Sequence, residues 1–209
     1  MLFFSRTINY HYAHFPRTRP HWIQAGSGGT RLAYTTHGRL DAAATNAILV
    51  TTFYGGRHAD YAGMIGPGRA LDPAKYFIVV ADMFCNGLSS SPSNTPAPFD
   101  GPRFPRITHW DNVHCQHRLL TAHLGVKRLA LATGFSMGGQ QANHWAAIFP
   151  DMVERLAPWC ASAKTAPHNR VFLEGVKAAL LADRGAGAPG LNAPDMECLD
   201  AALRELLAR

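Results

Sequence analysis

The sequence predicts an α/β fold in which a mostly parallel sheet carries helices on both faces. Two runs, Ala47–Thr52 and Tyr76–Asp82, are almost entirely apolar and rich in β-branched residues, as is typical of strands buried on both faces. Segments with helical patterns alternate with strand-like runs, which indicates a parallel sheet with crossover helices. A long segment rich in Ser, Pro and Asn, residues 86–105, follows one strand end, and α/β sheets bind ligands at such ends.

Local patterns predict the other elements. Arg31–Thr36 alternates as a half-buried strand does, Arg128–Thr133 is a short buried strand, and Met152–Trp159 is a further strand candidate. Helical spacing or composition predicts three helices, which are Trp110–Leu124, Met137–Phe149 and Val171–Ala182. The second of these ends where Pro150 cannot continue it.

Length and composition suit one globular domain. The chain has 209 residues, of which 47% are hydrophobic and 16% are charged, and this is enough for a sizeable core. The net charge of +6 is scattered along the chain, which argues against a nucleic-acid-binding surface. No stretch reaches the roughly 18 consecutive apolar residues of a membrane span.

The cysteines indicate a reducing environment. Cys85, Cys115, Cys160 and Cys198 lie far apart and form no C-x-x-C pair, so we expect reduced thiols in a cytoplasmic protein. The apolar run Leu2–Phe4 is too short for the core of a secretory leader.

The most informative motif is Gly134-Phe135-Ser136-Met137-Gly138, which joins a predicted strand to a predicted helix. A serine on such a turn is exposed, so that its hydroxyl can attack a carbonyl carbon. The flanking glycines suit a tight turn with a closely packed helix. Ser136 is therefore the candidate nucleophile, and the alternative is an ordinary Gly-Ser turn.

A serine acyl-enzyme also needs two backbone N–H donors for the oxyanion of its tetrahedral intermediate. One usually belongs to the residue after the nucleophile, here Met137, and the other to the loop after an early strand. That loop reads Thr52-Phe53-Tyr54-Gly55-Gly56. Tyr54 is the expected second donor and Phe53 the alternative, while the glycine pair is also compatible with a simple turn beside two core aromatic residues.

Three groups of segments carry a resemblance to a known family. They are Arg31–Tyr34 with Gly38–Ala42 and Asn46–Val50; Gly66–Asp72 followed by Tyr76-Phe77; and Leu124–Val126 followed by Gly134–Gly139. These resemble the opening strands, the GPGxALD block and the G-x-SMGG elbow of the homoserine O-acetyltransferase branch of the α/β-hydrolase superfamily. The resemblance covers roughly Gly29–Asp183.

The resemblance implies an α/β-hydrolase fold and a ping-pong acyl transfer through an acyl-serine. No bound cofactor or metal is implied; in the acetyltransferases acetyl-CoA is the acyl donor and the homoserine hydroxyl is the acceptor. We therefore expect a small ester or an acyl-CoA as substrate, and a homodimer is left open. Phe53, Gly55, Lys177 and His168 are the expected pocket residues.

The chain departs from the acetyltransferases at two places. Met83–Pro92 replaces their glycine-rich turn and GSTGP-like sequence. Lys177 stands where many of them have an arginine, and a lysine cannot form a bidentate clamp on a carboxylate. Both differences favour the esterase members, in which water attacks the acyl-enzyme.

The sequence lacks an obvious catalytic base. The family order is serine, acid, histidine, and the histidines after Ser136 are His144 and His168. His144 lies about 12 Å along the predicted helix, so we expect it to pack, and His168 is a weak candidate in a predicted loop. His114 and His117 precede the serine, and no zinc-ligand spacing completes a metal site there.

The family resemblance fades near Asp183. We expect a partial α/β-hydrolase domain over residues 1–183 and a non-family tail over residues 184–209, in which Asn192 caps a helix that ends at Arg209. The two further strands that carry the acid and the histidine in the family are not found, which suggests a truncated or frame-shifted member lacking the C-terminal strands. The two resulting hypotheses are a weakened serine acyl-enzyme and a non-catalytic remnant or interaction module.

Overall fold

Six strands form one mixed sheet in the structure, a computed structural model that describes residues 11–15 and 30–182. The strands are β1 (His11–Phe15), β2 (Thr30–His37), β3 (Ala47–Thr51), β4 (Phe77–Ala81), β5 (Leu129–Phe135) and β6 (Leu156–Trp159). Their order across the sheet is β1-β2-β4-β3-β5-β6. β3 to β6 run parallel, whereas β2 pairs antiparallel with both β1 and β4. The predicted fold class is confirmed.

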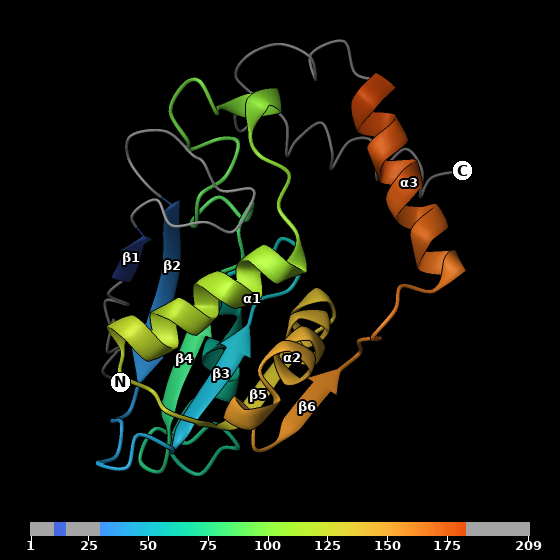
Figure 1. The fold of residues 1–209 in the computed structure, drawn as a ribbon. Coiled ribbons are helices and arrows are strands. Elements are labelled where there is room, and N and C mark those ends of the chain that lie inside the picture. Colours follow the sequence, from blue (N-terminus) through green and yellow to red (C-terminus); the bar gives the residue numbers. More distant parts are fainter. Residues whose placement is uncertain (1–10, 16–29, 183–209) are drawn as a thin grey trace, which may run out of the picture.

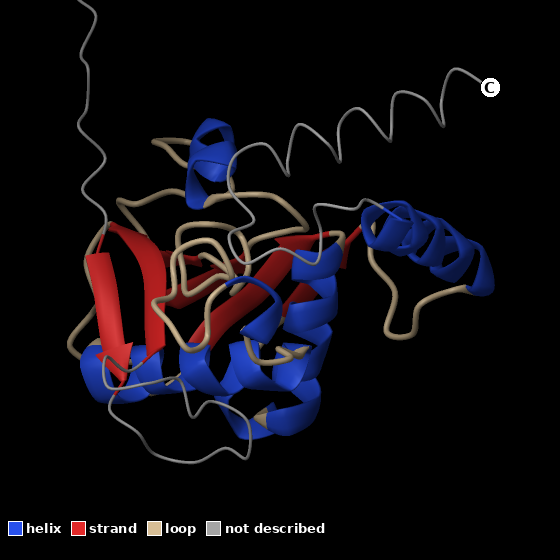
Figure 2. Ribbon diagram, turned by 90° about the horizontal axis from the view of Figure 1, so that it is seen from above, coloured by secondary structure: helices blue, strands red, loops and turns tan. Residues whose placement is uncertain are grey.

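Helices and short helical turns connect the strands of the described chain. The longer helices are α1 (His109–Arg118), α2 (Met137–Ile148) and α3 (Pro167–Ala182), and α1 continues as the π-helical turn η3 (Leu119–His123). The short turns are η1 (His58–Met64), η2 (Gly101–Arg103) and η4 (Pro150–Met152). α1 and α2 lie side by side on one face of the sheet, and α3 stands apart from it (Figures 1 and 2).

Each face of the sheet has its own hydrophobic core. Leu49 of β3 joins a core with α1 and α2, in which Trp145 is fully buried. The adjacent Ile48 and Val50 point to the opposite face, where they pack with Tyr61 of η1. Because both faces are covered, β3 shows no alternation of polar and apolar residues, as the sequence pattern predicts.

Capping residues decide where the helices begin. Thr108 caps α1: its backbone N–H donates to Asp111 Oδ2 (2.8 Å) and its hydroxyl accepts from Asp111 N (3.4 Å). α3 begins at Pro167, four residues before the predicted start at Val171, because proline suits the first turn of a helix. His168, expected in a loop, therefore lies in a helix.

The sheet ends in an exposed strand on the β6 side. Leu156 and Trp159 of β6 are 40% and 38% exposed, and on α3 the side chains of Val171 and Phe172 are 74% and 60% exposed. None of the described helices is long and apolar enough to span a bilayer.

Some expectations concern residues that the structure does not describe. They are the tail 184–209 with its helix from Asn192, and Cys198. Of the other cysteines, Cys85, Cys115 and Cys160 are all unpaired.

Candidate active site

Ser136 occupies a sharp bend between β5 and α2. β5 ends at Phe135 and α2 begins at Met137, so a single residue makes the turn. Its backbone has φ 51° and ψ −118°, a conformation that is unfavourable for any residue with a side chain. Ser136 N donates to Trp159 O (3.0 Å), and Ser136 O accepts from Gln140 N (3.1 Å). The residue is partly exposed, and this is the geometry predicted for a nucleophile elbow.

The glycines of the motif allow α2 to approach the sheet closely. A Cβ on Gly134 would lie 2.6 Å from both Gly138 C and Thr51 Oγ1, and a Cβ on Gly139 would lie 2.5 Å from Ala161 Cβ. A Cβ on Gly138 would overlap the carbonyl oxygen of Thr51. Each side chain would push the helix off the strands, so the motif is required by packing as well as by the bend.

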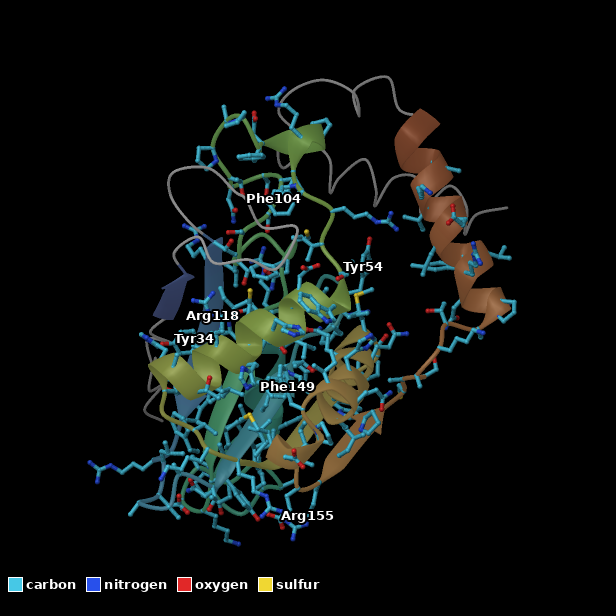
Figure 3. The ribbon with its side chains drawn as sticks, viewed as in Figure 1. Tyr34, Tyr54, Phe104, Arg118, Phe149 and Arg155 are labelled. Atoms are coloured by element: carbon cyan, nitrogen blue, oxygen red, sulfur yellow. The ribbon has the colours of Figure 1, made fainter. Side chains whose placement is uncertain are left out.

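The sheet register brings the elbow and the predicted oxyanion loop to one edge. Thr51 at the end of β3 pairs with Gly134 near the end of β5. Because the two strands are parallel neighbours, the loop after β3 and the elbow after β5 leave the sheet side by side. Tyr54, which is labelled in Figure 3, belongs to the loop at this edge.

The loop after β3 offers free backbone donors. Gly56 N donates to Phe53 O (2.9 Å), which closes a turn around Tyr54 and Gly55, and Gly55 takes a positive φ of 71°. Within the described part of the chain, the backbone N–H groups of Phe53, Tyr54 and Met137 donate no hydrogen bond. They are therefore available to an oxyanion, and both candidates for the second donor, Tyr54 and Phe53, stay open.

Aromatic side chains surround the elbow. The ring of Phe53 packs edge-on against Phe135 (centroids 5.5 Å apart) and Tyr61 (6.0 Å), and Phe135 packs against Trp159 (4.9 Å). Tyr61 OH donates to Thr51 O (3.0 Å) and accepts from Phe135 N (3.2 Å). Burial, more than any other cause, raises the pKa of Tyr61. Phe53 and Phe135 also pack against the hydrophobic core on this face of the sheet, so aromatic packing joins the loop after β3 to the end of β5.

Sequence reasoning missed a buried His–Asp pair behind the loop. His58 Nδ1 donates to Asp82 Oδ2 (2.5 Å), and His58 N donates to Asp82 Oδ1 (2.9 Å). The two residues are 4% and 0% exposed. One available signal was the position of Asp82 directly after a buried strand, a common place for functional carboxylates.

The strand order and the elbow match a known family. The family described as "alpha/beta hydrolase fold" matches residues 48–182. The chain belongs to this family.

Curated relatives of this α/β-hydrolase include esterases and acetyltransferases. The chain is 44% identical over 153 residues to an ethyl acetate hydrolase of Pseudomonas veronii, covering 73% of this chain and 44% of that protein. It is 38% identical over 175 residues to a homoserine O-acetyltransferase of Moorella thermoacetica, covering 75% of this chain and 46% of that protein. The resemblance to the homoserine O-acetyltransferase branch is confirmed.

A solved structure of an esterase is also similar to this chain. An acetylester hydrolase from Corynebacterium glutamicum matches with a TM-score of 0.82 and 35% identity, covering 94% of this chain and 56% of that chain. The chain spans about half the length of the curated relatives it matches.

Two predicted pocket residues of this α/β-hydrolase lie away from the elbow. His168 and Lys177 are exposed on α3, and Lys177 Nζ pairs with Glu174 Oε2 (3.3 Å) on the same helix. No hydrogen bond or ion pair joins either residue to Ser136 in the described chain. Phe53 and Gly55, by contrast, lie in the loop at the shared sheet edge. The pocket role of all four residues stays a prediction.

The histidines of α1 and α2 mostly pack against neighbouring side chains. His117 stacks on Phe149 (centroids 4.0 Å apart; Phe149 is labelled in Figure 3), and His114 stacks on Trp110 (3.5 Å). His144 Nδ1 donates to Gln140 O (3.0 Å), so it packs along its own helix as expected. No group of three potential ligands in the described residues is placed to hold a metal ion.

His109 is the histidine most closely linked to the elbow helix. Its Nε2 donates to Gln140 Oε1 (3.2 Å), one turn after Ser136, and its ring lies 5.3 Å from that of His144. Burial and then the neighbouring His144 lower the pKa of His109, although the bond to Gln140 acts in the opposite direction.

We expect His109 to make stability depend on pH. Because its pKa is lower in the folded than in the unfolded chain, unfolding takes up a proton once the pH falls below about 6.5. Its contribution to the free energy of unfolding is therefore complete above that pH and is lost as the pH falls towards the folded pKa. Urea unfolding at about pH 7.5 and about pH 5.5 should show a smaller pH effect in His109→Gln than in the parent chain. Equal pH effects in the two proteins would contradict this account; the exposed His123→Gln serves as control.

Proposed function

We propose that this α/β-hydrolase cleaves small acetate esters through an acyl intermediate on Ser136. The observation that carries the proposal is the strained, partly exposed conformation of Ser136 at the β5–α2 bend. Backbone strain of this kind persists where surrounding structure enforces it, and it is concentrated at functional sites. The ethyl acetate hydrolase and the acetylester hydrolase among the similar proteins support an acetate ester as the substrate.

In the proposed mechanism Ser136 Oγ adds to the ester carbonyl carbon, and its proton passes to a general base. The N–H groups of Met137 and Tyr54 stabilise the oxyanion that forms on the carbonyl oxygen. Collapse of the intermediate breaks the C–O bond to the alcohol, which leaves with the proton. Water then attacks the acyl-serine, acetate is released, and the hydroxyl is restored.

The base itself is not assigned to a described residue. No histidine among residues 30–182 is hydrogen-bonded to the Ser136 hydroxyl. In the α/β-hydrolase order the acid and the histidine follow the serine. The mechanism therefore requires a histidine that the described residues do not place beside Ser136. The rate of ester hydrolysis by this chain depends on whether such a histidine reaches the Ser136 hydroxyl.

Acetyl transfer from acetyl-CoA to homoserine is the second candidate, and the acetyltransferase relatives favour it. The first steps would be the same, but an alcohol in place of water would attack the acyl-enzyme. Lys177 supports hydrolysis instead, because it is exposed and already paired with Glu174. We also propose a cytoplasmic location and a homodimer for this chain. The unpaired Cys85, Cys115 and Cys160 support the cytoplasmic location.

A fluorophosphonate probe tests the proposal directly. We expect one probe per chain, mapped by peptide mass spectrometry to Ser136, with no labelling of the heat-denatured protein or of Ser136→Ala. Ethyl acetate should be hydrolysed by the same sample, and adding homoserine should not divert the acetyl group. A folded chain without any labelling would support the non-catalytic alternative. Acetylhomoserine as the main product would support the transferase.

A further inference from the structure

The loop Thr52–Gly56 is held where it ends by a cluster of three side chains, of which two are buried and one is half-buried. We propose that His58, Asp82 and Asn86, here called the Asp82 clamp, are positioning residues that set the oxyanion donor of this loop. The inference rests on the proposed function of Ser136 and adds residues to its machinery.

Asp82 is the centre of the clamp. It follows β4 directly and is 0% exposed. Its Oδ1 accepts from His58 N (2.9 Å) and from Asn86 Nδ2 (3.0 Å), and its Oδ2 accepts from His58 Nδ1 (2.5 Å). A buried carboxylate is tolerated only when its oxygens are satisfied, and these three donors do so. The groups bonded to Asp82 are therefore fixed relative to the sheet.

The clamp reaches the oxyanion loop through Gly56. Asn86 Nδ2 also donates to Gly56 O (3.2 Å), and Gly56 N donates to Phe53 O (2.9 Å). A displacement of Gly56 would therefore pass through this turn to the peptide group of Tyr54. His58 lies two residues after Gly56, so its bonds to Asp82 also hold the chain that leaves the loop.

The start of the loop is held independently of the clamp. Thr52 O accepts from Gln141 Nε2 (3.0 Å) on α2, and Thr52 Oγ1 accepts from Met83 N (2.9 Å). The loop thus has one end attached to the elbow helix and the other to the Asp82 clamp. Loss of the clamp would leave the loop attached but free to swing at Gly56.

Burial separates this role from direct catalysis. Asp82 and His58 are 0% and 4% exposed, so neither is placed to touch a substrate. Their effect on the reaction must pass through the loop, and displacement of a catalytic group by about 1 Å costs on the order of a hundredfold in rate.

Two substitutions of His58 make a matched test. In His58→Asn the side-chain amide occupies the position of Nδ1 and can still donate to Asp82, whereas in His58→Gln the amide reaches further and that donor is lost. We expect His58→Gln to react with the fluorophosphonate about 10- to 100-fold more slowly per folded molecule. The loss should lie in the maximal inactivation rate rather than in the probe's half-saturation concentration, and His58→Asn should recover most of it.

A second variant covers the case in which His58→Gln does not fold. Asn86→Ala releases Gly56 O but leaves the His58–Asp82 pair in place, and we expect about a tenfold slower reaction. The exposed His123→Gln controls for the loss of an imidazole. A purely structural clamp would lower the unfolding midpoint without changing the rate per folded molecule, and this result would overturn the proposal. Failure of both His58 variants to react, while Asn86→Ala reacts normally, would also overturn it.

Hydrogen–deuterium exchange separates failure of the clamp from failure of the proposed function. The amide of Gly56, which donates to Phe53 O in the parent chain, should exchange faster in His58→Gln and Asn86→Ala than in the parent chain and His58→Asn. If the parent chain is never labelled but this pattern appears, the clamp stands and the catalytic proposal fails. If labelling is normal but exchange is unchanged in the variants, the clamp is wrong.

Discussion

Ser136→Gly is expected to abolish labelling and ester hydrolysis and, at the same time, to raise the unfolding midpoint. Loss of the hydroxyl removes the nucleophile, so we expect labelling and hydrolysis to fall to the background of the uncatalysed reaction. Glycine adopts a positive φ without the side-chain clash that Ser136 endures at φ 51°. Relief of strain worth about 1–3 kcal/mol outweighs the backbone entropy of an added glycine, about 0.5–1 kcal/mol.

Ser136→Ala is the matched control for this result. It removes the same hydroxyl but keeps a Cβ, so it should lose activity equally and gain no stability from the backbone. The glycine variant should therefore exceed the alanine variant by about 1 kcal/mol, or about 2–4 °C in unfolding midpoint. Equal midpoints in the two variants would mean that the bend stores no strain, and the main argument for Ser136 as nucleophile would fail.

The elbow could be predicted from the sequence because its glycines, its serine and the flanking strand and helix patterns are adjacent in the chain. The strand and helix patterns flank Ser136 directly, and Gly134 and Gly138 stand in the same short motif. The atoms that a Cβ on Gly138 would meet belong to Thr51 and Thr52, which are distant in the sequence, so the packing reason for that glycine is visible only in the structure. The unalternating run Ala47–Thr52 likewise reflects burial on both faces of β3. Each of these two signals is contained in one short, continuous stretch of the sequence.

The Asp82 clamp could not be predicted because its members are brought together only by the fold. His58 and Asp82 are 24 residues apart, His58 at the start of η1 and Asp82 directly after β4, and neither has a neighbour in the sequence that indicates a partner. β1 was missed for a similar reason, since His11–Phe15 is short and gains its order by pairing with β2. The helical position of His168 was missed because the Pro167 signal for a helix start was overlooked.

The two ends of the candidate site therefore differ in how they are built. The elbow is determined by backbone packing, in which no side chain can be added at three glycines. The oxyanion loop is determined by side-chain hydrogen bonds to Gln141 at one end and Asn86 at the other. Substitutions at the elbow glycines should consequently affect folding first, and substitutions in the clamp should affect the reaction first.

Gly138→Ala tests most directly whether backbone packing determines the elbow. The added Cβ would overlap Thr51 O, which is a backbone atom of the central strand and already accepts a hydrogen bond from Tyr61 OH (3.0 Å). The same strand and helix are joined by the bond from Thr51 Oγ1 to Gly138 O (2.7 Å). The helix must move away to make room, and we expect the free energy of unfolding to fall by about 3 kcal/mol.

Gly175→Ala is the matched control, because a Cβ at Gly175 meets nothing within 4 Å and the residue lies in the exposed helix α3. That change should be neutral or should stabilise the helix by up to about 1 kcal/mol. Urea unfolding followed by circular dichroism would measure both variants. A Gly138→Ala protein as stable as Gly175→Ala would mean that α2 does not pack on β3 as closely as described. The explanation of the Ser136 bend by close packing of helix and strand would then be wrong.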